Sequence, residues 1–176
     1  MHVGGPCSPI VKVGDRVLRG QLIAEPSGLG ANIHASYTGE VTAVTETDIV
    51  IKADDKQNFD EYVKIPDTKT NLEAIAAAGV VGAGGAGFPT AVKLKTEIPQ
   101  GCFIANCAEC EPLLAHNIHQ IETDAAQLVR GVKYAMEITK APKGYIAIKP
   151  KHKKAVIELI KAWRNEDNID VFRLPD

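Results

Sequence analysis

The sequence lacks several features that would assign it to a functional class at once. No apolar run approaches the roughly 18 residues that a membrane-spanning helix needs, so we expect no direct membrane insertion. Aromatic residues make up only 5% of the chain, which disfavours a base-stacking surface for nucleic acid. Neither sign of charge dominates, because 20 basic residues stand against 22 acidic ones, and this balance also disfavours nucleic acid as a partner.

The sequence also shows no secretory signal and has few cysteines. The first residues carry no basic stretch followed by an apolar core, so we expect a cytoplasmic protein, free or peripheral to a membrane complex. Four cysteines in 176 residues are too few for a scaffold built on disulfides. The chain does have 45% hydrophobic residues, which is ordinary for a folded protein of one domain or two small ones.

Residues 1–53 consist of short apolar runs separated by Gly, Pro, Ser or Asp, a pattern that predicts a small β-domain. The succession of residues 13–17, 20–23, 33–36 and 39–41 resembles the barrel-sandwich fold of lipoyl and biotinyl domains. A carrier domain of that kind needs a lysine at an exposed hairpin tip. No lysine occurs between Gln21 and Val44, so we expect a structural cousin that carries neither lipoyl nor biotin.

The rest of the chain predicts a linker and an α/β domain. Residues 54–70 are polar and charged, with solvation as the simplest role for their charges. Helices are predicted at 71–78, around 128–136 and at 155–163, buried strands at 102–105 and 144–148, and a third strand at 169–174. The first helix has Thr70 as its N-cap and Gly79 as its stop. This alternation predicts a largely parallel sheet in an α/β domain over 71–176.

A glycine-rich run at 79–90 is the sharpest feature of the sequence. Five of the nine residues from 79 to 87 are glycine. A bare backbone lets main-chain N–H groups approach an anionic oxygen, and the N-terminus of a helix after Pro89 adds a favourable dipole. A flexible linker is the alternative, but linkers carry polar residues in place of Ala, Val and Phe. We therefore predict a phosphate-binding loop, followed one turn later by Lys93.

Gly82, Gly84 and Gly87 also fit the G-x-G-x-x-G dinucleotide fingerprint. That fingerprint requires a strand directly before its first glycine. The preceding residues predict a helix and leave only Val80 and Val81 for a strand, so an ordinary Rossmann NAD(P)-dependent reductase is a weaker alternative. A P-loop is excluded, because no Gly-Lys-Ser/Thr ends the run.

Two motifs resemble those of one family. Residues 82–94, Gly-Ala-Gly-Gly-Ala-Gly-Phe-Pro-Thr-Ala-Val-Lys-Leu, are similar to the flavin loop of the NADH-binding subunit of respiratory complex I. They resemble more closely the Rnf complex C subunit and its relative, the proline reductase-associated electron transfer protein. Residues 106–112, Asn-Cys-Ala-Glu-Cys-Glu-Pro, resemble a second segment of the Rnf-type proteins. Cys107 stands where that segment usually has Gly, and Leu113 stands where Tyr is common.

The resemblance implies a site for FMN, with NADH as the substrate. The flavin contacts that it implies are Gly82, Gly84, Gly85, Lys93, Asn106 and Glu109. It puts Phe88 beside the nicotinamide and Glu111 near the flavin–NADH pocket, so Glu109 and Glu111 are the candidate catalytic carboxylates. A simpler alternative for both glutamates is the acidic first turn of a helix before Pro112, and the two roles are compatible.

The cysteines do not predict a metal site. Cys102, Cys107 and Cys110 have the spacing of three ligands of a plant-type [2Fe–2S] site, but no fourth cysteine follows. Cys102 begins a predicted buried strand, which indicates core packing for its thiol. Cys107 and Cys110 lie too close to His116 and His119 for a zinc finger. We expect free thiols, and both histidines on a polar helix face.

Together these features predict an electron-transfer flavoprotein module that passes electrons from NADH through FMN to an iron–sulfur partner. The partner would be a separate redox protein or the remainder of the same polypeptide, such as a ferredoxin domain, a reductase or a membrane complex. Resembling proteins run well over twice this length, so we expect here only the first half of the flavin domain. Their [4Fe–4S] clusters belong to a C-terminal part that this chain lacks. The alternative is a non-catalytic docking or structural fragment with an incomplete flavin site, and NADH-dependent oxidoreductase activity is expected only where the full site is assembled.

Overall fold

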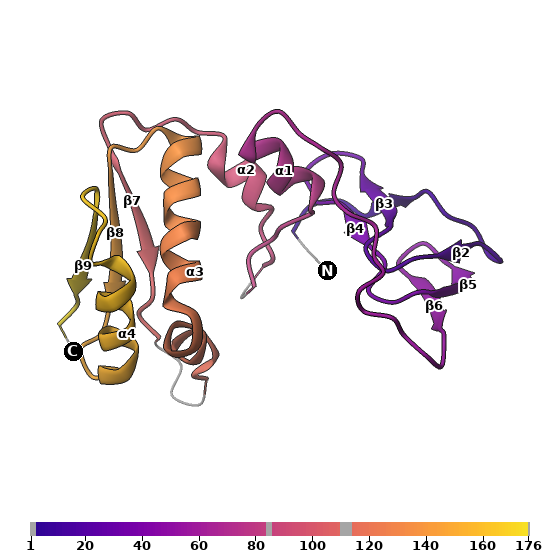
Figure 1. Ribbon diagram of the computed structural model, residues 1–176. Coiled ribbons are helices and arrows are strands. Elements are labelled where there is room, and N and C mark those ends of the chain that lie inside the picture. Colours follow the sequence, from indigo (N-terminus) through magenta and orange to yellow (C-terminus); the bar gives the residue numbers. More distant parts are fainter. Residues whose placement is uncertain (1–2, 84–85, 110–113, 176) are drawn as a thin grey trace. The chain divides into compact units, whose positions relative to one another are not determined.

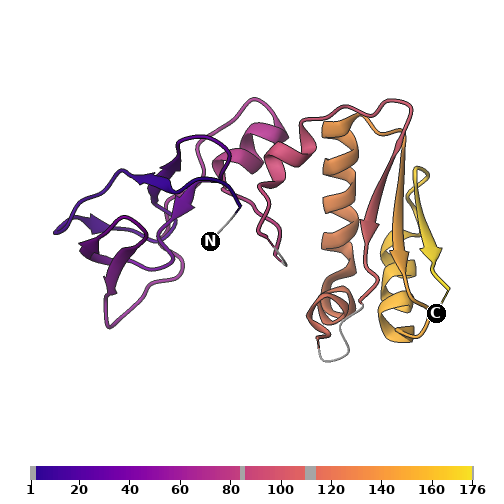
Figure 2. The same ribbon diagram turned by 180° about the vertical axis from the view of Figure 1, so that it is seen from behind.

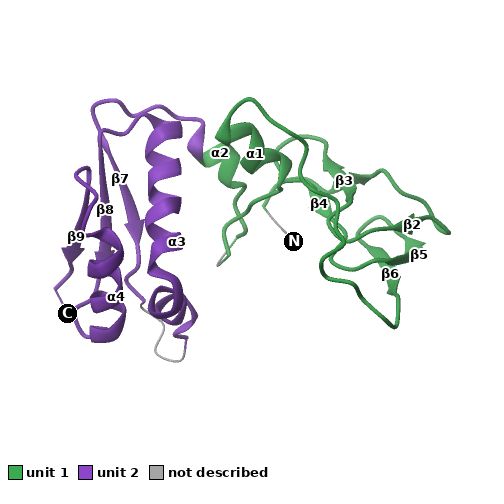
Figure 3. Cartoon of the chain, in the orientation of Figure 1, with its two compact units in different colours: residues 1–93 green, residues 94–176 purple. Residues whose placement is uncertain are grey.

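A computed structural model describes residues 3–83, 86–109 and 114–175 of the chain. It divides into two compact units, unit 1 at 1–93 and unit 2 at 94–176, which are described separately (Figure 3). Among the described residues, no helix is long and apolar enough to cross a membrane. The domain boundary predicted at residues 70 and 71 stays a prediction, because a compact unit and a sequence domain need not end at the same residue.

Unit 1 contains two antiparallel sheets of three strands, in the orders β1-β3-β4 and β2-β5-β6 (Figure 1). The strands are β1 (Cys7–Pro9), β2 (Arg16–Val17), β3 (Leu22–Pro26), β4 (Ile33–His34), β5 (Gly39–Val44) and β6 (Ile49–Ala53). Val17, Ile23, Ala35 and Val41 form the buried core between them. The predicted small β-domain is therefore confirmed. The pattern missed β1, because a strand of Cys, Ser and Pro shows no apolar alternation.

The predicted linker, residues 54–70, is neither helix nor strand, but its first half is bound to the β-domain. Arg16 donates two hydrogen bonds to the Asp54 carboxylate, at 3.2 and 2.5 Å. This guanidinium lowers the pKa of the Asp54 carboxyl below its ordinary value. The Gln57 amide bonds both backbone groups of Thr38, at 3.1 and 2.9 Å. Solvation as the role of these charges is thus wrong for Asp54, whose partner lies 38 residues away.

Helix α1 (Asn71–Ala77) confirms the prediction at 71–78. The Thr70 hydroxyl accepts the Glu73 N–H at 3.1 Å, and the Glu73 carboxylate accepts the Thr70 N–H at 3.2 Å. This reciprocal capping box satisfies donors that a helix start otherwise leaves unpaired. Gly79 ends the helix with a φ of 66°, a left-handed value suited to glycine. The glycine-rich run therefore leaves α1 in a fixed direction, and a short helix, α2 (Thr90–Leu94), follows it.

Unit 2 contains a parallel sheet in the order β7-β8-β9, which confirms the α/β prediction. The strands are β7 (Cys102–Asn106), β8 (Lys143–Ile148) and β9 (Ile169–Arg173), and the helices are α3 (His116–Thr139) and α4 (Lys153–Trp163). The two helices pack against each other and share one core with alternate residues of β8, Ile146 and Ile148 (Figures 1 and 2). The helices thus cover the face of β8 that these two side chains occupy.

Strand β7 exists where it was predicted, but the prediction that it is buried is wrong. Cys102 and Asn106 are exposed, and Ile104 is 58% exposed. The reason is topological, because β7 lies at the edge of the sheet and its alternate side chains face away from the helices. The expected core packing of the Cys102 thiol is therefore wrong as well.

Candidate functional site

The glycine-rich run forms a loop that its own backbone closes. Gly82 N–H donates to the Phe88 carbonyl at 3.0 Å, and Thr90 N–H donates to the Val80 carbonyl at 2.9 Å. Val81 and Pro89 form an antiparallel bridge between these bonds. The segment before the first glycine is thus half of a narrow hairpin and not a strand of a parallel sheet. This geometry does not match the strand–turn–helix arrangement of an ordinary Rossmann site.

Gly87 gives the loop its tight return toward α2. Its backbone is buried and has a φ of 61°, in the left-handed region where residues with a Cβ are uncommon. The following helix has only five residues, so its dipole is small, and the expected contribution of a helix N-terminus is correspondingly weak. An anion at this loop would depend on main-chain N–H groups and on a cationic side chain.

Lys93 supplies that cationic side chain. Its Nζ lies 6.0 Å from the centre of the Phe88 ring, at the outer limit of a cation–π contact. In the part of the chain that the structure describes, Lys93 has no carboxylate partner. The Phe88 ring is 37% exposed. The structure thus brings together an accessible aromatic face and an ammonium group that the sequence identified separately.

Asn106 ends β7 and Glu109 follows it, at the carboxyl end of the sheet in unit 2, where open α/β sheets bind ligands. The Asn106 side chain accepts the Ala108 N–H at 3.0 Å and turns the chain out of the strand. The Asn117 amide of α3 donates to the Glu109 carboxylate at 3.1 Å. Helix α3 begins at His116, so Glu109 is not in its first turn, and the alternative of an acidic helix start before Pro112 stays a prediction because residues 110–113 lie outside the described residues. Asn117 was missed, since one polar residue in a polar helix turn carries no pattern.

The predicted site residues are therefore divided between the two units. Gly82, Phe88 and Lys93 are described in unit 1 and Asn106 and Glu109 in unit 2, whereas Gly84, Gly85 and Glu111 lie outside the described residues. The prediction of His116 and His119 on a polar helix face is confirmed, because both are exposed on α3. Within residues 3–83, 86–109 and 114–175, no group of three His, Cys, Asp or Glu is placed to hold a metal.

Cys107 anchors the segment between Asn106 and Glu109. Its N–H donates to the Ala147 carbonyl of β8 at 2.8 Å, and its side chain packs against the core of unit 2. Burial raises the pKa of this thiol to about 11. A thiol in place of the usual glycine thus acts as a small apolar side chain that fixes the segment.

Cys102 and Cys107 should react with iodoacetamide at very different rates at pH 8. The thiolate is the reactive form, and with a pKa of about 11 only about one Cys107 molecule in a thousand is ionised at that pH. Cys102 is exposed and serves as the internal reference. Tandem mass spectrometry locates the modified residue, and Cys107 labelling should rise as the pH approaches 11. Equal rates at pH 8 would contradict the burial of Cys107.

Two models of known protein families match the chain. Residues 75–176 match the family model described as the Nuo51 FMN-binding domain, and residues 1–65 match the RnfC barrel sandwich hybrid domain. The fold and the two matches define a class of protein in which a barrel-sandwich domain precedes an FMN-binding domain of the respiratory type. Within this class, the chain belongs to the family of the Rnf complex C subunits.

The relatives support this assignment over nearly the whole chain. The C subunit of the Na(+)-translocating ferredoxin:NAD(+) oxidoreductase complex of Acetobacterium woodii is 37% identical, over 99% of this chain and 43% of the relative. Its counterpart in the proton-translocating complex of Clostridium ljungdahlii is 34% identical, over 99% and 42%. Cobalamin reductase PduS of Salmonella typhimurium is 47% identical, over 59% and 22%. The chain thus spans less than half the length of these relatives.

Proposed function

We propose that this chain is the flavin-binding electron-transfer module of an Rnf-type C subunit, which takes electrons from NADH and delivers them to an iron–sulfur partner. The observation that carries the proposal is the closed glycine loop with Lys93 beside it, inside a segment that matches an FMN-binding domain. When bound, FMN exchanges a hydride with a nicotinamide and releases electrons singly to a metal cluster.

The described residues of unit 1 fit the phosphate of such a cofactor. Lys93 carries a positive charge without a carboxylate partner among the described residues, and a lysine binds phosphate as a point charge. As the family resemblance implies, the bare backbone at Gly82, Gly84 and Gly85 would let phosphate oxygens approach main-chain N–H groups, although Gly84 and Gly85 lie outside the described residues and the N–H of Gly82 itself is bonded to the Phe88 carbonyl. Phe88 would offer its exposed ring face to the nicotinamide and thereby orient it.

In unit 2, the proposed roles follow from the polar groups after β7. The Asn106 amide can bond a ribityl hydroxyl, and the Glu109 carboxylate can accept hydrogen bonds from hydroxyl or ring N–H groups. The amide of Asn117 keeps one Glu109 oxygen oriented, which limits the rotation of that carboxylate. We assign Glu111 to the nicotinamide side of the site, as the family resemblance implies.

The physiological partners belong to this proposal too. Two relatives are named as components of ferredoxin:NAD(+) oxidoreductase complexes and one as a cobalamin reductase, so a common module would serve different acceptors. Because the chain spans 43% of the Acetobacterium relative, the clusters that receive the electrons are proposed to lie in the part of the protein beyond this module. A cytoplasmic location, peripheral to a membrane complex, follows from the same proposal.

FMN titration of the purified chain, followed by quenching of flavin fluorescence, tests the proposal. The wild-type chain should bind one FMN, and Lys93→Ala should weaken binding by about tenfold or more, because a charge-assisted phosphate contact is lost. Lys95→Ala is the matched control, since Lys95 is also exposed and lies two residues further along.

Unchanged affinity in Lys93→Ala would reject the phosphate role of Lys93. A wild-type chain that takes up no FMN would support the alternative, a docking or structural fragment whose flavin site is incomplete. Equal losses in Lys93→Ala and Lys95→Ala would indicate a general charge effect and would also reject the specific contact.

A further inference from the structure

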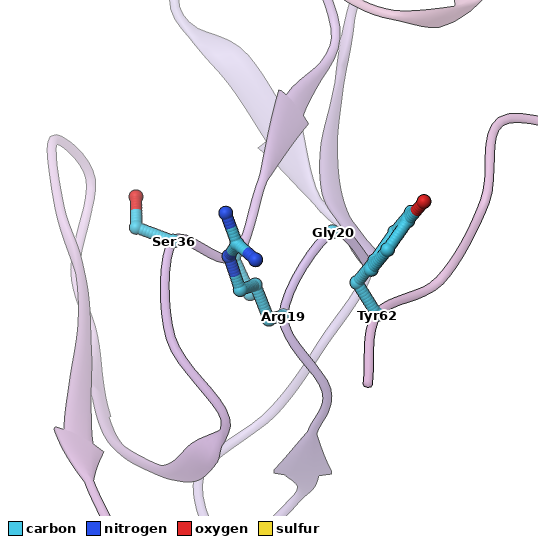
Figure 4. Close-up of a pocket in the computed structure, with 5 residues that line it drawn as sticks. Arg19, Gly20, Ser36 and Tyr62 are labelled. Atoms are coloured by element: carbon cyan, nitrogen blue, oxygen red, sulfur yellow. The ribbon is translucent and has the colours of Figure 1, made fainter. Parts of the chain in front are cut away.

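A second candidate site lies in unit 1 and involves none of the predicted flavin residues. It is a pocket of about 440 Å³ lined by Arg19, Gly20, Ala35, Ser36 and Tyr62. Figure 4 shows the guanidinium of Arg19 between Ser36 and Tyr62, with all three polar ends extending toward the same side of the pocket. The lining contains one cation, two hydroxyls and no acid, so its polar character favours an anion.

Arg19 is held in position by contacts that leave part of its guanidinium available. Nη1 donates to the Phe59 carbonyl at 2.8 Å, and the guanidinium lies 5.3 Å from the centre of the Phe59 ring. Arg19 forms no ion pair with any acid in the described part of the chain. A guanidinium has five N–H donors in a planar fork, and this one is preorganised by stacking.

The backbone beneath the pocket is equally fixed. The N–H of Arg19 donates to the Thr38 hydroxyl at 3.0 Å, and its carbonyl accepts the Val63 N–H at 2.8 Å. The N–H of Gly20 donates to the Ala35 carbonyl at 2.8 Å. These bonds join the β-domain to the segment after it, so the pocket does not have to be ordered when a ligand binds. Preorganisation of this kind lowers the entropic cost of binding.

Three exposed aromatic rings lie at the pocket or next to the residues that line it. Tyr37 is 49%, Phe59 57% and Tyr62 53% exposed, and the rings of Tyr37 and Phe59 meet edge to face with centroids 6.3 Å apart. The whole chain has only four Tyr, four Phe and one Trp, so a third of its aromatic residues gather at this place. Arginine and tyrosine are enriched among the residues that carry the binding energy of protein interfaces.

We propose that this pocket docks an acidic segment of a partner protein, with a single Asp or Glu carboxylate seated against Arg19, Ser36 and Tyr62. The planar carboxylate matches the fork of the guanidinium. Asp60 and Glu61 precede Tyr62 in the chain and are exposed, and their negative charge disfavours a phosphate or a run of acids. The ligand is therefore one carboxylate flanked by apolar side chains, which contact the surrounding rings.

NMR titration of the full chain with two blocked peptides tests this proposal. The probes are acetyl-Leu-Asp-Leu-amide and its asparagine counterpart, observed through the backbone amides of the 15N-labelled protein. The aspartate peptide should shift the amides of Gly20, Ser36 and Tyr62 and should bind with a Kd about tenfold or more below that of the asparagine peptide. Equal binding of the two peptides, or shifts confined to other residues, would overturn the proposal.

Three variants and two small anions complete the test. Arg19→Gln should abolish the preference for aspartate, and Arg130→Gln, an exposed arginine on α3, should keep it. Arg19→Gln also removes the bond to the Phe59 carbonyl. Ser36→Ala, which leaves every contact of Arg19 intact, should therefore weaken binding of the aspartate peptide alone.

Acetate or inorganic phosphate binding as tightly as the aspartate peptide would assign the pocket to a free anion and would overturn docking. Because the pocket lies outside the predicted flavin residues, FMN affinity should be unchanged in all three variants.

Discussion

Replacing Leu159 with alanine should lower the free energy of unfolding of unit 2 by about 2–5 kcal/mol. Leu159 lies on α4 and is 0% exposed, in the core that α3 and α4 form with β8. Ile146 and Ile148 of that core are also fully buried. The loss combines the transfer free energy of the deleted methyl groups with a cavity, because close-packed neighbours relax only in part.

Trp163 makes this effect measurable in unit 2 alone. It is the single tryptophan of the chain, lies at the end of α4, and donates its indole N–H to the carbonyl of Ile169. Its fluorescence should therefore report urea unfolding of the unit that contains Leu159. Ile157→Ala is the matched control, because Ile157 belongs to the same helix but is 53% exposed, and it should change stability by about 0.5 kcal/mol or less. Equal losses from the two substitutions would mean that α4 presents a different face to the core.

Local patterns predicted most of the fold, because each depends on residues close together in the sequence. The predicted N-cap at Thr70 and the predicted stop at Gly79 belong to one short helix, and the capping box that Thr70 forms with Glu73 covers four residues. The apolar stripe from Leu128 to Met136 lies within α3, with Val132 and Ala135 buried. The sequence did not indicate that α3 starts twelve residues earlier, at His116, because its first turns are polar and Asp124 interrupts the helical geometry there.

Contacts between distant residues explain the predictions that were wrong. An apolar run like that of β7 occurs both in strands inside a sheet and in strands at its edge. The sequence therefore could not show whether Cys102 is buried or exposed. The ion pair of Arg16 with Asp54 joins a strand to a segment that looked merely polar. The pocket around Arg19 is a further example, since Phe59 and Tyr62 reach it only once the chain has folded back.

The candidate flavin site was predictable in residue type but not in geometry. Glycine content indicated an anion-binding loop, yet only the structure shows which bonds close it and that Gly87 has a left-handed φ. Likewise, the position of Lys93 one turn after the loop was readable, whereas its approach to the Phe88 ring was not. The sequence identifies the polar and charged groups that a ligand could contact, and the fold determines which of these groups lie close together.

Gly87→Val should weaken FMN binding by about tenfold or more. A β-branched residue at a φ of 61° costs about 1–3 kcal/mol, which corresponds to a factor of about 5–150 in an equilibrium constant. The loop can relieve this strain only by losing the turn that places the Phe88 carbonyl against the Gly82 N–H. Its main-chain donors would then no longer converge on the phosphate.

Ala86→Ser is the control for this substitution, because Ala86 is the exposed neighbour of Gly87 and lies outside the left-handed region. It should retain wild-type FMN affinity, and far-UV circular dichroism should show that both variants remain folded.

The double variant Gly87→Val with Lys93→Ala tests whether the loop and Lys93 act on the same phosphate or on different parts of the ligand. If both residues act on the same phosphate, their effects on binding should be less than additive, because the contact that the second change removes is already weakened. Full additivity would place Lys93 and the loop on different parts of the ligand, and wild-type affinity in Gly87→Val would reject the loop as the flavin phosphate site.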